Sequence, residues 1–115
     1  MKRQVTCLIA ATLVAGCSSA GKLRDLPPTA VFVSSESRSD VVNCINTAWS
    51  QKSLPFDVVP YTGGDSIQLR ETAGGPVAAL VDVTATSDHT TLRYYSETFT
   101  QDAWYVDQIK VCAKQ

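Results

Sequence analysis

The cysteines are the side chains of this sequence with the widest choice of covalent chemistry. A thiol can form a disulfide, act as a nucleophile, hold a metal or carry a modification, and four are present: Cys7, Cys17, Cys44 and Cys112. No two of them form the Cys-x-x-Cys pair that is typical of redox centres. His89 is the only histidine, so a cysteine–histidine metal site would lack ligands. We therefore expect no redox centre and no metal at these cysteines.

Residues that could catalyse a reaction without a metal are equally sparse. The sequence has no Gly-x-Ser-x-Gly nucleophile elbow, and its Gly-Gly pairs fall in predicted hairpin turns without the Lys-Ser/Thr of a phosphate loop. His89 lies in a predicted tight turn beside Asp88, where contact with solvent is more common than catalysis. Asp82 is placed mid-strand between apolar neighbours and is a catalytic candidate only if its face of the strand is not the solvated one. We expect no enzymatic activity and no cofactor.

The N-terminal residues have the composition of an export signal. Met1, Lys2 and Arg3 form a short basic start, and an uncharged, mostly apolar run follows over residues 5–14. A basic start followed by an apolar stretch of this length is typical of a secretory signal peptide. The alternative, a helix packed on the folded domain, is disfavoured because the run has no polar face.

The end of this segment resembles the lipobox of bacterial lipoproteins. That motif is an aliphatic residue, a small residue, Gly or Ala, and then Cys, and it corresponds here to Leu13-Val14-Ala15-Gly16-Cys17. The resemblance covers the N-terminal segment alone. It implies that diacylglycerol alkylates the Cys17 thiol, that the chain is cut before Cys17, and that the new amine is acylated. Plain secretory cleavage, with Cys17 left as a thiol, is the alternative.

Acylation at Cys17 would make membrane lipid the first partner of the protein. Several acyl chains anchor a protein stably, whereas one chain holds it only marginally. Ser18 follows Cys17, while an Asp at that position resembles the inner-membrane retention signal of well-studied Gram-negative bacteria. The expected location is the outer membrane, lipid-anchored and facing the periplasm, with residues 1–16 removed as the signal peptide.

The mature chain would be small and mildly acidic. Removing residues 1–16 from 115 leaves 99 residues, with eight basic and eleven acidic side chains and a net charge near -3. That balance offers no clustered basic surface for nucleic acid. Cys44 and Cys112 are the cysteines that remain, and an even number in an oxidising compartment indicates a disulfide. Two buried free thiols are the alternative.

Residues 17–29 are expected to form a tether that begins with the lipidated cysteine. They lack helical or strand periodicity and end in Pro27-Pro28 before a threonine. A flexible chain of this length spans roughly 18–20 Å on average. Leu23 and Leu26 could pack on the domain or on the lipid, and the pattern does not decide between them. The rest of the chain, residues 30–115, is expected to be one small domain.

The pattern within that domain predicts an α+β fold. A β-branched run indicates a strand over residues 30–35, and apolar residues at helical spacing predict a helix over 38–52. Alternating residues from 56 to 95 predict a four-stranded antiparallel meander, in which Val77 shares a face with Ala79, Val81 and Val83. A last helix follows, with Thr100 as its cap.

The order of these elements is strand, helix, four strands, helix. Cys44 and Cys112 each lie on the apolar stripe of a predicted helix. We therefore expect both helices on one face of the sheet, joined by one disulfide, with the other face exposed to solvent. The order resembles the helix-grip arrangement, including domains of some outer-membrane assembly lipoproteins, at the level of fold alone.

The exposed face is the expected place for recognition. Exposed tyrosine, tryptophan and arginine side chains are common anchors at protein interfaces, and the candidates are Tyr61, Arg70, Arg93, Tyr94, Tyr95 and Trp104. The preferred interpretation is a non-enzymatic envelope lipoprotein that binds a protein partner. One alternative is an inhibitor-type lipoprotein that acts on a cell-wall hydrolase or excludes phage or competitors. Another is a hydrolase or small-ligand binder, which the lack of a nucleophile–base set disfavours.

Overall fold

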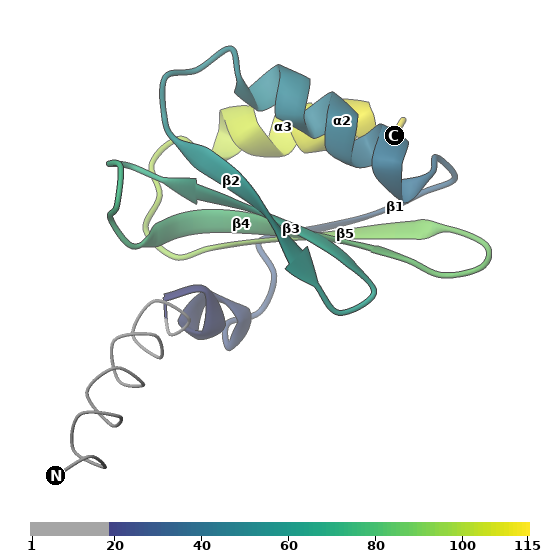
Figure 1. Ribbon diagram of the computed structural model, residues 1–115, viewed down its shortest axis with the longest axis horizontal. Helices are drawn as coiled ribbons and strands as arrows, with labels where there is room; N and C mark the ends of the chain where they lie inside the picture. The colour runs from purple at the N-terminus through teal and green to yellow at the C-terminus, as the bar shows by residue number, and fades with distance from the viewer. Residues whose placement is uncertain (1–18) are drawn as a thin grey trace, which may run out of the picture.

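The computed structural model describes residues 19–115, which form one antiparallel sheet with helices on it (Figure 1). The sheet has five strands in the order β1-β5-β4-β3-β2. This confirms the predicted α+β class. The labelled elements are β1 (Ala30–Ser34), α2 (Arg38–Trp49), β2 (Phe56–Tyr61), β3 (Gly64–Arg70), β4 (Val77–Ala85), β5 (Thr90–Ser96) and α3 (Asp102–Cys112). None of the helices within residues 19–115 is long and apolar enough to cross a membrane.

Local signals in the sequence explain where the two long helices begin. Ser37 has extended backbone angles before α2, and its side chain accepts a hydrogen bond from the backbone N–H of Asp40, as a helix N-cap does. The predicted cap of α3 is wrong, because Gln101 occupies that position and makes no side-chain capping bond. Asp102 lies in the first turn of α3 instead, where a negative charge is favourable for the helix dipole.

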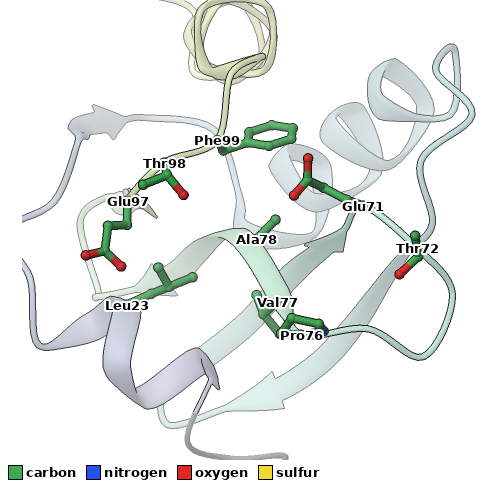
Figure 2. A pocket seen from close by; sticks show the side chains of 9 residues that line it. All are labelled: Leu23, Glu71, Thr72, Pro76, Val77, Ala78, Glu97, Thr98 and Phe99. Atoms are coloured by element: carbon green, nitrogen blue, oxygen red, sulfur yellow. The ribbon is translucent and has the colours of Figure 1, made fainter.

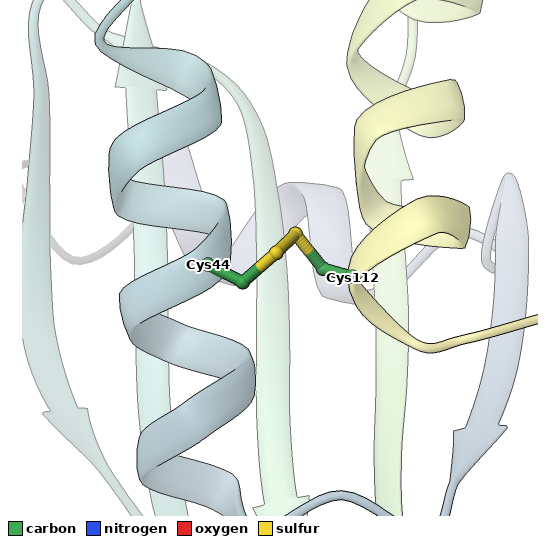
Figure 3. Close-up of a disulfide and its surroundings, with 2 residues drawn as sticks. All are labelled: Cys44 and Cys112. Carbon is green, nitrogen blue, oxygen red and sulfur yellow. A yellow bond between two sulfur atoms is a disulfide. The ribbon is translucent and has the colours of Figure 1, made fainter.

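Both helices lie on the same face of the sheet, as the cysteine positions indicated. Residues at helical spacing bury one stripe of each helix against this face: Val41, Ile45 and Trp49 from α2, and Tyr105, Ile109 and Cys112 from α3. A disulfide joins Cys44 to Cys112 with an S–S distance of 2.02 Å and a Cα–Cα distance of 5.6 Å (Figure 3). The predicted bond is confirmed, and it links the middle of α2 to the last turn of α3.

The opposite side of the sheet, here called the second face, is also partly apolar. The register between β3 and β4 shifts at Leu69/Arg70, so that Leu69 pairs with Ala79 while Arg70 pairs with Val77. Ala78 is therefore an extra residue, and such a bulge reverses the alternation on one side of it. Val77 consequently joins Leu80 in a second apolar cluster rather than the core beneath the helices. The predicted face of Val77 is wrong for this reason.

The chain before β1 is not the flexible tether that its composition suggested. Residues 19–24 are helical, and Figure 1 shows them on the side of the sheet away from α2 and α3. Ala20 and Leu23 are each about 95% buried in the cluster that contains Val77 and Leu80. We call residues 19–26 the N-terminal segment. It lies folded against the second face, so that part of this face is covered.

Candidate functional site

One arginine of the N-terminal segment makes polar contacts with the second face. The Arg24 guanidinium donates through Nε to Asp82 Oδ2 at 2.8 Å and through Nη2 to Asp82 Oδ1 at 2.9 Å. The same Nη2 donates to Ser66 Oγ at 3.0 Å. The Asp82 side chain is 5% exposed and that of Arg24 is 23% exposed. A two-point contact of this kind fixes the orientation of both side chains as well as their distance.

An aromatic ring completes the environment of this arginine. The guanidinium carbon of Arg24 lies 4.2 Å from the centroid of the Tyr61 ring, within the range of a cation–π interaction. The hydrogen bonding of Arg24 to Asp82 raises the pKa of Arg24 above its ordinary value, although burial opposes the shift. Burial, followed by the negative charge of Asp82, raises the pKa of Tyr95. We call Arg24, Asp82, Ser66 and Tyr61 the arginine clamp.

The sequence left open whether Asp82 lies on a solvated face of its strand, and the arginine clamp decides this. The Asp82 carboxylate faces the side of the sheet that was expected to be solvated, but the N-terminal segment covers it. Both carboxylate oxygens of Asp82 accept hydrogen bonds from Arg24. The group that could have accepted a proton in catalysis is therefore already paired with the arginine. The arginine clamp is therefore suited to holding the N-terminal segment against β4.

Four residues of the predicted recognition surface lie on the second face. Arg93 is opposite Asp82, and Tyr95 is opposite Leu80, in the register between β4 and β5. Tyr61 is 37% exposed beside Arg24. Arg70 donates to the carbonyl of Gly75 and to Asp57, which restrains its side chain near the β3–β4 turn.

Two residues of that predicted surface lie elsewhere, and their assignment to it is wrong. Tyr94 is fully buried beneath the helices, and its hydroxyl donates to Asp102 Oδ1 at 2.6 Å. Burial, and then this hydrogen bond, raises the pKa of Tyr94. Trp104 belongs to α3, where it packs edge-on against Tyr105 and beneath the ammonium group of Lys52. Neighbouring residues of a strand point to opposite faces, so Tyr94 and Tyr95 could not both have been on the second face.

The part of the second face that the N-terminal segment leaves open is a strip along β1 and β5. Val31 and Val33 are each 50% exposed there. Val31 pairs with Arg93 and Val33 with Thr91, so the two valines and Arg93 lie on the same face at this edge of the sheet. The sequence pattern did not indicate these valines, because alternation alone does not tell which face of an edge strand is covered. We call Val31, Val33 and Arg93 the open strip.

A cavity lies at the β3–β4 end of the sheet, beside the N-terminal segment (Figure 2). It has a volume of about 360 Å³ and is bounded by the segment, the β3–β4 turn and the connection from β5 to α3. Apolar side chains form its floor and two carboxylates flank it, the lining residues being Leu23, Glu71, Thr72, Pro76, Val77, Ala78, Glu97, Thr98 and Phe99. Within residues 19–115, no group of three or more His, Cys, Asp or Glu side chains is arranged to hold a metal ion.

His89 occupies the β4–β5 turn that the sequence predicted. Its Nδ1 lies 3.3 Å from Thr86 Oγ1, and its backbone N–H donates to the same hydroxyl oxygen. The imidazole thus takes part in the local bonds of an exposed turn.

The predicted lipidation site, Cys17, lies outside the residues that the structure describes. Comparisons of the chain with protein-family models, with curated proteins and with solved structures found no match.

Proposed function

We propose that this protein is a lipid-anchored accessory protein of the bacterial envelope, which binds a protein partner and does not catalyse a reaction. The observation that carries the proposal is the run Leu13-Val14-Ala15-Gly16-Cys17 after a basic start and an apolar stretch. Acylation of Cys17 would attach the protein to a bilayer, and Ser18 after it favours the outer membrane with the domain in the periplasm.

The disulfide supports export of the domain. Disulfides persist in oxidising compartments such as the periplasm and are rare in the bacterial cytoplasm. Cys44 and Cys112 are at bonding distance on two helices that pack together. A cross-link between elements so far apart in the chain is most valuable to a small domain whose apolar core is limited.

The geometry of the second face supports binding rather than catalysis. Asp82, which was the candidate catalytic carboxylate, is paired through both oxygens with Arg24. The open strip instead combines exposed valines with an arginine, and apolar side chains beside an arginine are typical of protein interfaces. We propose the open strip as the surface that contacts the partner.

Membrane fractionation of a Cys17→Ser variant tests the anchor. We expect the variant to leave the membrane fraction, whereas the unaltered protein stays with membranes in high salt. Cys7→Ser is the matched control, because Cys7 lies within the segment that cleavage before Cys17 would remove. A Cys17→Ser protein that still resists salt extraction would contradict the proposal.

Photo-cross-linking in cells tests the binding surface. A photoreactive residue placed at Val33, in the open strip, should give one dominant cross-linked product in envelope extracts. The control is the same residue at Val111, which is 66% exposed on α3. Equal cross-linking at both positions would contradict the open strip as the binding surface. A cell-wall hydrolase as the cross-linked protein would favour the inhibitor alternative over an accessory role.

A further inference from the structure

Ser19, the first residue that the structure describes, lies at the β3–β4 end of the sheet. Ser19 Oγ lies 3.4 Å from the backbone N of Val77, the first residue of β4, and accepts its hydrogen bond. Ser19 also lines a hollow with Pro55 and with Gly74 and Gly75 of the β3–β4 turn. Figure 1 shows the N-terminal segment beneath this end of the sheet. The chain therefore reaches the domain at the β3–β4 turn and not at the opposite end.

Very little chain separates this point from the proposed lipid. Cys17 precedes Ser19 by two residues, and two extended residues span at most about 7 Å. The acyl chains would thus be attached within about 7 Å of Ser19, whose side chain contacts the β3–β4 end of the sheet. The roughly 18–20 Å of freely moving tether that the composition suggested is not available, because residues 19–24 are helical.

The attachment is also directional, because the N-terminal segment is fixed at two places. Ala20 and Leu23 are buried against Val77 and Leu80. Arg24 pairs with Asp82, two residues further along the same face of β4 than Leu80. Two contacts along one strand prevent the segment from pivoting about a single point, so the position of the lipid relative to the sheet is set by the folded domain.

From this geometry we infer that the anchored protein stands on the membrane in one orientation, with the β3–β4 turn at the lipid surface. The inference rests on the acylation of Cys17 proposed above. β4 has nine residues, and at about 3.3 Å per residue it separates the β4–β5 turn from the β3–β4 turn by about 26–30 Å along the strand, in the direction away from the bilayer. The arginine clamp maintains this orientation. Val33 pairs with Thr91, near the β4–β5 turn, so a partner could reach it from the periplasm.

Fluorescence quenching by lipid tests the orientation. Ala73→Cys and Ser87→Cys each place one label in an exposed turn, at the near and the far end. The acylated protein is reconstituted in vesicles of phosphatidylethanolamine and phosphatidylglycerol that contain a headgroup-linked quencher. We expect the label at 73 to lose most of its fluorescence and the label at 87 to keep most of it. Equal quenching in protein that floats with the vesicles would overturn the orientation and leave the lipid anchor intact. Protein that does not float would overturn both.

Loss of the arginine clamp tests what maintains the orientation. Asp82→Asn removes the charge of the carboxylate while keeping its size, and Arg93→Ala on the same face is the matched control. We expect quenching at 73 and 87 to become similar in Asp82→Asn and to stay different in Arg93→Ala. A difference that persists in Asp82→Asn would overturn the role of the clamp. If Asp82→Asn does not fold, the orientation itself is still tested by the labels at positions 73 and 87 in the protein that keeps Asp82.

Discussion

The two faces of the sheet are covered by different kinds of contact. On one face, α2 and α3 bury a continuous apolar core and are joined by a disulfide. On the other, the short N-terminal segment buries a small cluster and depends on the ion pair between Arg24 and Asp82. Apolar burial contributes in proportion to area and without direction, whereas an ion pair selects one geometry. The helix-covered face thus supplies most of the stability, and the second face sets the position of the N-terminal segment.

The largest effect should come from the helix-covered face. Replacing both Cys44 and Cys112 with alanine removes a cross-link that restricts the unfolded chain, and we expect a loss of about 2–4 kcal/mol in the free energy of unfolding. A domain of this size loses roughly 4–8 °C of Tm per kcal/mol, so Tm should fall by about 10 °C or more. Thermal denaturation followed by circular dichroism measures this. A change below about 2 °C would mean that the bond contributes little to holding the helices.

A smaller and more local effect should follow from Arg24→Ala on the second face. The Asp82 carboxylate, at 5% exposure, loses its counter-ion, and an unpaired buried charge is costly. Because Arg24 itself is partly solvated, we expect a loss of about 1–3 kcal/mol. The N-terminal segment should detach, so that trypsin cuts after Lys22 faster than in the unaltered protein. Mass spectrometry of timed digests measures this cleavage.

The matched control for that experiment is Arg93→Ala, which removes an exposed arginine from the same face. Its stability should stay within about 0.5 kcal/mol of the unaltered protein. If Arg24→Ala and Arg93→Ala were cut at the same rate after Lys22, the clamp would not be what holds the segment.

Removing the hydroxyl group from each of two buried tyrosines on the helix-covered face should change the free energy of unfolding differently. Tyr94 donates a 2.6 Å hydrogen bond to Asp102, and we expect Tyr94→Phe to cost about 1–2 kcal/mol. The Tyr105 hydroxyl is buried without a hydrogen-bond partner among residues 19–115. Tyr105→Phe should therefore be neutral or stabilising by up to about 1 kcal/mol. Urea unfolding measures both variants, and an equal loss in both would contradict the assigned roles.

Alkaline pH should lower the free energy of unfolding through Tyr94, on the helix-covered face. Burial and Asp102 raise its pKa above the ordinary value of 10.0, so the folded protein keeps a phenolic proton that the unfolded chain releases. The unfolded state then binds fewer protons, and stability falls as pH rises above about 10 by up to about 1.4 kcal/mol per unit. Urea midpoints at pH 9, 10 and 11 measure the slope. Tyr94→Phe should show a shallower slope, and an unchanged slope would contradict this assignment.

Sequence patterns predicted the helix-covered face better than the second face, for physical reasons. Helical spacing is a local signal, and it predicted the apolar stripe of each helix. One of the two cysteines lies on each stripe, which placed both helices on the same face. The contact of Arg24 with Asp82 joins residues 58 positions apart, and no periodicity around residue 24 indicates it. The bulge at Ala78 likewise depends on how β3 and β4 pair. Strand alternation requires Tyr94 and Tyr95 to lie on opposite faces, but both were expected on the exposed face, and alternation gives no sign of which one faces the helices.

The most direct test of this account is the mass of the mature N-terminus. The protein is purified from membranes and digested with trypsin, which should release the peptide from Cys17 to Lys22. We predict that this peptide begins at Cys17 and carries a diacylglyceryl group on the thiol and an acyl chain on the amine. A peptide with an unmodified Cys17 thiol, or one that continues through the uncut bond between Gly16 and Cys17, would contradict the lipid anchor and the membrane orientation that depends on it.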